Sequence, residues 1–357
     1  MDLTDRLRAW THHRQRLSDK APTAMEALSS VVAVYSAHPT APLALGARVV
    51  GMTAEDFREL DRRREALRIP GMRGSLFLAP RDTAVRVFAP FVMSTARVMT
   101  RLRRGRMTED EYAAAAARVV ATATTPLLPR ELQEAAGVKG ADMSLLLRTI
   151  RGQGRLLAVS EGSLRAATLR YVATECWARG SLQAADADAA LVELAGDYLR
   201  AYGPARVADF AWWTGVAKNV AARALRAQET VDLGAGLLLP NGDEQPFAAV
   251  TPRSGTVDLL PKWDPYTMGH APDGRARLVH PHNQRRIYVQ KGVVAPGQPN
   301  VGLPGDGYPV VLIDGQAVGT WSVTLKGTAC ELFDSIGLAT RSRLDERLAA
   351  AAALLAG

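Results

Sequence analysis

Apolar residues recur at helical spacing in the first part of the chain. Residues 3–18 place Leu, Leu, Trp and Leu on one face, which predicts an amphipathic helix. A second helix is predicted to begin after Thr23, because Glu26 three residues later completes a capping box, and to run through the apolar stretch 27–34. A third helix, over about 53–67, is followed by two short strands around a glycine turn within 68–78. Helices followed by such a hairpin form a winged-helix unit.

The same order of helices and strands returns twice. In the second copy, helices are predicted at 108–122, 129–136 and 142–153, and strands at 155–160 and 163–171. In the third, helices are predicted at 186–202, 204–213 and 215–227, and strands at 229–239 and 247–250. The third hairpin is predicted from Asn241-Gly242, a strong turn signal between strand-like runs. From about residue 256 the pattern is rich in strands, Gly and Pro, and a last helix is predicted over 340–355.

Composition indicates the class of partner. Of 357 residues, 47% are hydrophobic, which is enough for several cores, and the formal net charge is +8. A positive surplus dominated by Arg favours a polyanion such as nucleic acid or an anionic membrane surface, although a basic balance can also serve solubility alone.

The sequence gives no sign of a cofactor, a metal or a membrane. Cys176 and Cys330 lack metal-binding spacing, and His270, His280 and His282 with Asp264 match no known metal site. We find no phosphate-binding loop, dinucleotide motif or nucleophile elbow. The N-terminus lacks a secretory signal and no run approaches the length of a membrane span, so we expect a cytoplasmic protein without cofactor or metal. We expect the adjacent His12 and His13 to lie on the surface.

A short polar pair stands out within the first unit. Ser36 and His38 lie two residues apart, immediately before Pro39, where the predicted helix 27–34 has to end. Side chains at such a point can face a groove, where a hydroxyl and an imidazole can hold a water. Alternatively, the two side chains bond free carbonyl groups at a helix end and do nothing else.

The residues around this pair follow a family pattern. After Ser36 come Ala-His-Pro-Thr-Ala-Pro and Leu-Ala-Leu-Gly-Ala-Arg, and residues 68–78 read Arg-Ile-Pro-Gly-Met-Arg-Gly-Ser-Leu-Phe-Leu. Residues 260–270 read Leu-Pro-Lys-Trp-Asp-Pro-Tyr-Thr-Met-Gly-His, 292–296 read Gly-Val-Val-Ala-Pro, and 313–321 read Ile-Asp-Gly-Gln-Ala-Val-Gly-Thr-Trp. With these motifs the chain resembles, over nearly its whole length, the AlkZ/YcaQ-like bacterial DNA glycosylases. In that family the position of Ser36-Ala37-His38 carries a catalytic Gln-x-Gln motif, so this chain departs from the family at both catalytic positions.

The resemblance and the repeated pattern together imply an α+β fold. We expect three tandem winged-helix units, a small C-terminal β-barrel and a terminal helix. The expected parts are 1–105 (winged helix 1, with the catalytic motif), 106–182 (winged helix 2), 183–255 (winged helix 3) and 256–357 (the barrel and the terminal helix).

The resemblance also implies an activity. It implies a DNA glycosylase that hydrolyses the N-glycosidic bond of bulky N7-alkylguanine adducts in double-stranded DNA. The implied biological roles are base excision repair and self-resistance to a DNA-alkylating, intercalating natural product. Alkylation makes the base a cationic leaving group, so the enzyme has mainly to place a water under C1′ and to stabilise an oxocarbenium-like sugar. By resemblance, His38 takes the water's proton and Ser36 positions the water. With no lysine near the pair to form a Schiff base, we expect a monofunctional enzyme, acting as a monomer.

Further residues are assigned to DNA and to the damaged base. The predicted DNA contacts are basic residues in three places: the first wing, the recognition helices of the second and third units, and a predicted hairpin over 269–277 with the basic residues that follow it. They are Arg68, Arg73, Arg148, Arg151, Lys218, Arg223, Arg275, Arg277, Arg285 and Arg286. The predicted lesion pocket comprises Tyr35, Trp263, Asp264, Tyr266 and His270. The adjacent Trp212 and Trp213 fit core packing or stacking against a base.

A second hypothesis from another class remains open. The changed motif also fits a winged-helix protein that binds DNA without cleaving it, either a regulator or a resistance factor that sequesters a drug.

Overall fold

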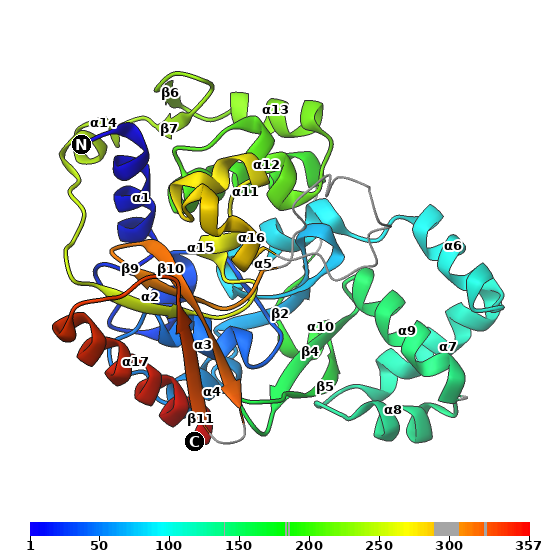
Figure 1. Cartoon of the computed structure of the whole chain (residues 1–357). Coiled ribbons are helices and arrows are strands. Elements are labelled where there is room, and N and C mark those ends of the chain that lie inside the picture. The colour runs from blue at the N-terminus through cyan, green and yellow to red at the C-terminus, as the bar shows by residue number, and fades with distance from the viewer. Residues whose placement is uncertain (139, 183, 185, 289–306, 325–326) are drawn as a thin grey trace, which may run out of the picture.

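The hairpins of the first and second predicted units join edge to edge in one antiparallel sheet. The structure, a computed structural model, describes residues 1–138, 140–182, 184, 186–288, 307–324 and 327–357. The sheet has the strand order β1-β3-β2-β4-β5. Its strands are β1 (Val34–Tyr35), β2 (Ala66–Pro70), β3 (Leu76–Pro80), β4 (Leu156–Glu161) and β5 (Thr168–Ala173). Arg68 of β2 pairs with Ala158 of β4, which makes the sheet continuous between the two units (Figure 1).

The helices of the first predicted unit are short. They are α1 (Leu3–Arg14), α2 (Ala24–Ser29), α3 (Thr40–Gly46), α4 (Ala54–Arg62), α5 (Arg81–Phe88) and the 3-10 turns η1 (Met72–Gly74) and η2 (Ala89–Phe91). The predicted cap at Thr23 is present, since its hydroxyl accepts a hydrogen bond from the Glu26 amide. The stretch 27–34 is buried as predicted, but the prediction that it is helical throughout was wrong: α2 ends at Ser29 and the chain enters strand β1 at Val34. The β-branched valines of this stretch favour the extended conformation that pairs with β3.

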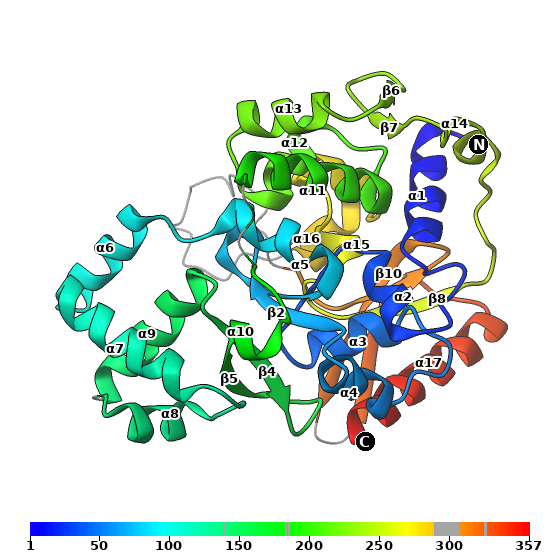
Figure 2. The ribbon, with the colours of Figure 1, turned by 180° about the vertical axis from the view of Figure 1, so that it is seen from behind.

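The helices of the second unit form, with the last helix of the first, an arm that extends to one side of the molecule (Figures 1 and 2). The helix from the first unit is α6 (Thr95–Arg104), and those of the second are α7 (Glu109–Thr122), α8 (Pro129–Ala136), α9 (Gly140–Gly152) and the short α10 (Thr174–Trp177). The prediction that α8 ends at Gly137 is confirmed, because this glycine adopts a left-handed conformation (φ 60°) as a C-cap. The arm has a core of its own, in which Leu102, Leu132 and Leu146 are buried.

The helices of the third unit pack against the main sheet. The hairpin that ends this unit differs from the predicted one. The helices are α11 (Ala187–Tyr202), α12 (Val207–Thr214), α13 (Lys218–Arg226) and α14 (Glu244–Ala249). The hairpin consists of β6 (Thr230–Asp232) and β7 (Leu238–Pro240), so its turn lies at 233–237 and not at Asn241-Gly242. Gly234 and Gly236 supply the positive φ angles of that turn (99° and 73°), and residues 247–249, predicted as strand, belong to α14.

The C-terminal part contains an open antiparallel sheet. Its order is β11-β10-β9-β8, with β8 (Val257–Leu260), β9 (Val310–Ile313), β10 (Gln316–Thr324) and β11 (Gly327–Leu332). In the described residues β8 and β11 are the two edges and do not pair, so the expected closed barrel is not found there. Short helices α15 (Pro265–Met268), η3 (Pro272–Arg277), η4 (Pro281–Asn283) and α16 (Gln284–Ile287) lie between β8 and β9, and residues 292–296 lie outside the described part. The expected terminal helix is α17 (Leu338–Ala356), and its Leu344 and Leu355 join the core formed with the sheet.

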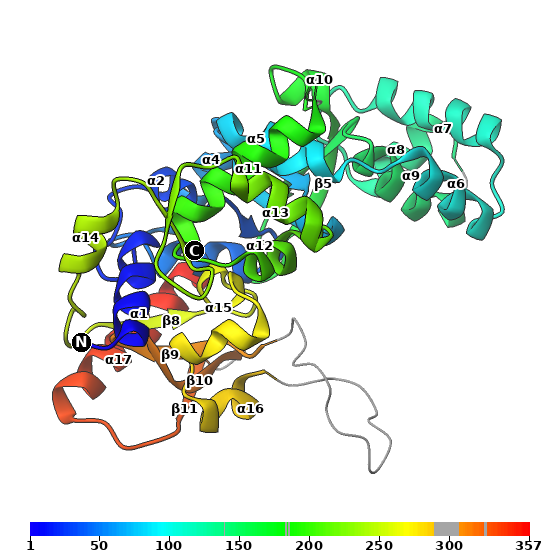
Figure 3. The same ribbon diagram turned by 90° about the horizontal axis from the view of Figure 1, so that it is seen from above.

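Buried ion pairs connect the N-terminal helices to the C-terminal sheet. Arg48, which follows α3, is fully buried and donates to both carboxylate oxygens of Asp264 at 2.7 and 2.8 Å. His12 is also buried, with Nε2 2.8 Å from Asp258 Oδ2 on β8. The prediction of a surface position was therefore wrong for His12, although His13 is exposed. Figure 3 shows α1 beside β8 and α15. Within the described residues, no helix is both long and apolar enough for a membrane crossing.

Candidate active site

The strand β1 fixes the backbone that carries the polar pair. Tyr35 pairs with Phe77 of β3, and the Ser36 amide continues the ladder by donating to the Leu76 carbonyl at 2.9 Å. His38 follows two residues later, before Pro39 caps α3. The pair thus lies at the end of a strand and not, as predicted, at the end of a helix.

The imidazole of His38 is held by the second wing. Its Nδ1 is 3.4 Å from the Ser163 carbonyl oxygen, and its Nε2 is 3.2 Å from Ser160 Oγ. Because a carbonyl oxygen can only accept, the proton belongs on Nδ1, and Nε2 accepts from the Ser160 hydroxyl. The Phe57 ring of α4 lies edge-on at 5.5 Å between centroids. The geometry therefore selects one tautomer and one ring orientation.

The surroundings keep this imidazole neutral. Burial, followed by the positive charge of Arg68, lowers the pKa of His38 to about 4, against an opposing effect of hydrogen bonds from the imidazole to the backbone at Ser163 and Leu164. Arg68 is itself buried and paired with Asp61 of α4. Above about pH 4 the His38 side chain is consequently an uncharged hydrogen-bonding group.

The Ser36 hydroxyl is buried and makes no hydrogen bond with any described group of the protein. Only 2% of the residue is exposed. A buried polar atom that is left without a partner costs about 1–3 kcal/mol. Such a cost is expected where a side chain serves a ligand and not the fold.

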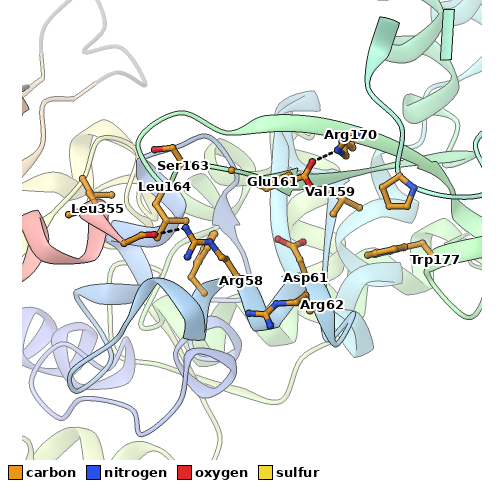
Figure 4. Close-up of a pocket in the computed structure, with 16 residues that line it drawn as sticks. Arg58, Asp61, Arg62, Val159, Glu161, Ser163, Leu164, Arg170, Trp177 and Leu355 are labelled. Carbon is orange, nitrogen blue, oxygen red and sulfur yellow. Dashed lines mark hydrogen bonds and ion pairs between the residues drawn. The ribbon is translucent and has the colours of Figure 1, made fainter. Parts of the chain in front are cut away.

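Both partners of His38, Ser160 and Ser163, line a cavity of about 590 Å³, and Figure 4 shows this cavity with Ser163 labelled. Ser160, Ser163 and Phe57 all line it, so the imidazole is separated from the cavity by the residues that hold it. Its walls come from α4, the β4–β5 hairpin and the end of α17. Charged side chains of both signs face this cavity: Arg58, Asp61, Arg62, Glu161 and Arg170.

A second, aromatic pocket of about 270 Å³ lies at the other side of β1. We call it the aromatic pocket; its aromatic lining is Tyr35, Phe77, Tyr202, Trp212, Trp213 and Trp263. The centroids of Tyr35 and Trp263 are 4.6 Å apart, so these two predicted lesion-pocket residues do come together. The motif segment therefore runs between an aromatic pocket on the Tyr35 side and a larger cavity on the His38 side, which apolar and charged residues line together.

Comparison with known proteins identifies the family and the fold. The model of a family described as "DNA glycosylase AlkZ-like" matches residues 7–356. The chain belongs to the AlkZ-like DNA glycosylase family. Its fold is that of the Streptomyces sahachiroi DNA glycosylase AlkZ, with a TM-score of 0.75 and 17% identity over 98% of this chain and 97% of that one. A search of curated proteins gave no match.

Three residues assigned to the lesion pocket of this AlkZ-like chain have structural contacts instead. Asp264 is fully buried in its pair with Arg48, and Tyr266 is fully buried and donates to the Gly315 carbonyl at 2.8 Å. His270 is 1% exposed, with Nε2 3.0 Å from the Tyr202 carbonyl oxygen, and burial lowers its pKa to about 3. We therefore remove these three residues from the predicted lesion pocket.

The predicted DNA contacts divide by exposure. Arg68, Arg275 and Arg277 are 1%, 0% and 6% exposed, so they cannot reach a phosphate in this structure and we no longer expect them to contact DNA. The predicted hairpin with a basic tip is instead η3, which turns both of its arginines inward. The remaining positions are the exposed Arg73, Arg148, Lys218, Arg223, Arg285 and Arg286 and the partly buried Arg151. Arg286 pairs with Glu331 at 2.9 Å.

The structure adds residues that the sequence did not indicate. Ser160 and Ser163 fell only within the two predicted strands of a wing, and they lie more than 120 positions from His38 in the chain. No spacing rule connects such distant positions. Trp212 lines the aromatic pocket with part of its surface exposed, whereas Trp213 is buried in the core. Among the described residues, no group of three or more His, Cys, Asp or Glu side chains is placed to hold a metal ion; His280 and His282 merely stack at 5.0 Å.

Proposed function

We propose that this AlkZ-like chain hydrolyses the N-glycosidic bond of bulky N7-alkylguanine adducts in duplex DNA, using Ser36 and His38. The observation that carries the proposal is the buried, unpartnered hydroxyl of Ser36 two residues from a neutral, oriented imidazole, at the position of the family's catalytic motif. The resemblance further suggests a role in base excision repair and in self-resistance to a DNA-alkylating natural product.

The pKa of His38 indicates that this residue orients the water and does not deprotonate it. An imidazole with a pKa of about 4 is a weak base at neutral pH, so it orients a water better than it removes a proton. A cationic N7-alkylguanine leaves without an acid, and the remaining task is to hold the water at C1′. A neutral hydrogen-bonding pair can do this, as the amide pair of the family motif does.

Ser160 is the third member of the proposed site. Its hydroxyl donates to His38 Nε2, which leaves its own lone pairs for a water on the cavity side. In this arrangement Ser160 Oγ accepts from the water, His38 fixes the direction of the Ser160 hydroxyl, and Ser36 supplies a second hydroxyl. Each of the three residues binds or orients, and none has to change its charge.

One observation favours the alternative of a protein that binds DNA without cleaving it. Both nitrogens of His38 already have partners within the protein, at 3.4 and 3.2 Å, which also suits a purely structural imidazole. Incubating the protein with N7-alkylated duplex and then cleaving abasic sites separates the two functions. Strand breaks support the enzyme, whereas a gel shift without breaks supports the binder.

Two details of the proposal have tests of their own. Hydrolysis without a Schiff base predicts that borohydride traps no covalent protein–DNA complex during turnover. If a complex forms, Lys262, whose Nζ lies 4.2 Å from the centre of the Trp263 ring, is the first residue to substitute. Catalysis without a metal predicts an excision rate that EDTA leaves unchanged.

A further inference from the structure

The aromatic pocket combines flat apolar walls with positive charge at its margin. Its Tyr35 ring lies between Phe77 and Trp263, with centroid distances of 6.2 and 4.6 Å and steep interplanar angles of 89° and 62°. Walls of this kind accept a planar ring by stacking and edge contacts. A volume of about 270 Å³ admits a group of one or two fused rings.

Cations of the protein lie over two of the aromatic rings of this pocket, Trp212 and Trp263. The Arg73 guanidinium lies 4.5 Å from the centre of the Trp212 ring and its Nε donates to the Trp212 carbonyl at 2.7 Å. The buried Arg275 guanidinium lies 5.5 Å from the same ring, and Lys262 Nζ lies 4.2 Å from the Trp263 ring. Among the described residues that line the pocket, Arg73 carries the only charge.

The positive charges at the margin of the aromatic pocket determine which charge a bound ring can carry. An aromatic cage that binds cations presents free ring faces to them. Here protein cations take that place, so a positively charged N7-alkylpurine would meet like charge. An uncharged or anionic ring with phenol, carbonyl or carboxylate oxygens would instead stack on the walls and accept hydrogen bonds from Arg73.

We infer that the aromatic pocket binds the planar, oxygen-bearing aryl portion of a bulky adduct, and not the alkylated purine itself. The inference rests on the proposed function for its biological setting, since Tyr35 adjoins Ser36 in the chain and brings the pocket next to the motif. It assigns the two parts of one lesion to different places: the aryl group to this pocket and the sugar with its cationic base to the side of His38 and Ser160.

The test uses three free probes of equal size and different charge. Binding of 1-naphthoate, 1-naphthol and 1-naphthylmethylammonium to the full chain is measured by quenching of tryptophan fluorescence, since three tryptophans line the pocket. We expect saturable quenching in the order naphthoate, naphthol, naphthylmethylammonium, with at least about a tenfold difference between the anion and the cation. Tightest binding of the cation would overturn the inference and make the pocket a purine site.

Variants establish which cavity binds the probe. Tyr35→Leu and Trp212→Leu should each weaken naphthoate binding about tenfold or more, provided that thermal unfolding shows a folded protein. The control is Trp177→Leu, which removes a tryptophan with an arginine over its ring from the larger cavity and should leave naphthoate binding unchanged. Loss of binding in this control, or unchanged binding in both pocket variants, would refute the assignment. Excision of N7-alkylguanine by the wild type is measured separately, so failure of one proposal is distinguishable from failure of the other.

Discussion

The pH dependence of excision gives a direct test of how the protein uses His38. A free histidine loses its positive charge near pH 6.5, whereas burial and the charge of Arg68 hold the pKa of His38 at about 4. At pH 5.5 the His38 imidazole is then about 97% neutral, against about 9% for an unperturbed histidine. The rate constant of excision should therefore stay nearly constant from pH 7.5 to 5.5 and fall only as the pH approaches 4.

The assay is single-turnover release of an N7-alkylguanine base with enzyme in excess, so that DNA binding is saturated at each pH. Release without enzyme is subtracted, because the cationic base also leaves spontaneously. The His38→Gln variant, which restores the amide of the family motif at this position, should lose the fall near pH 4. NMR titration of the His38 imidazole, assigned by its absence in this variant, measures the same pKa without catalysis.

The same pKa has a consequence for stability that must be checked in parallel. Between pH 6.5 and 4 the unfolded chain takes up a proton at His38 and the folded chain does not, so stability falls as the pH falls through this range. The loss is at most about 3 kcal/mol for a shift of this size. Circular dichroism at each pH therefore has to show a folded protein. An excision rate that halves near pH 6.5 in the wild type, but not in His38→Gln, would refute the assignment of a neutral imidazole to His38.

Three further predictions concern other parts of the site and fold. Ser160→Ala should slow excision by about tenfold, the value of one hydrogen bond, with little change in DNA affinity; a normal rate would remove Ser160 from the site. Arg48→Met should lower the free energy of unfolding by about 3–5 kcal/mol in urea, because it leaves the buried Asp264 carboxylate unpaired, whereas Arg62→Met on the exposed face of α4 should change stability little. Arg148→Gln should reduce the salt dependence of DNA binding by about one unit of slope, a change that Arg341→Gln on α17 should not produce.

Local signals predicted much of the fold. The helix starts at Thr23 and Thr53 and the helix end at Gly137 depend on side chains within a few positions, and the structure has all three. The secondary structure of the stretch 27–34 was harder to predict, because a short apolar run is compatible with a buried strand as well as with a buried helix. Only the pairing of Val34 with Leu78 of β3, more than 40 positions away, decides between them.

Long-range partners explain what the sequence could not predict about the site. Arg68 precedes a glycine turn, where a DNA contact is expected, yet its side chain is buried in the core and pairs with Asp61. Asp264 lies in the motif segment 260–270, which suggested a place in the lesion pocket, yet its carboxylate pairs with Arg48, 216 positions earlier in the chain. The partners of His38 come from a different wing, which no pattern in the first unit reveals. The tandem units and four-part division stay a prediction, since one sheet joins the first two wings.

The most direct measurement of the central claim compares the wild type with His38→Ala on one N7-alkylated duplex. Base release and DNA affinity are determined in the same buffer, with abasic sites cleaved to report release. We predict that His38→Ala slows excision by about tenfold or more, as the loss of Ser160 does, while its DNA affinity stays within a few fold. Excision that survives the substitution, or affinity that collapses with it, would show that His38 holds the fold and does not serve the reaction.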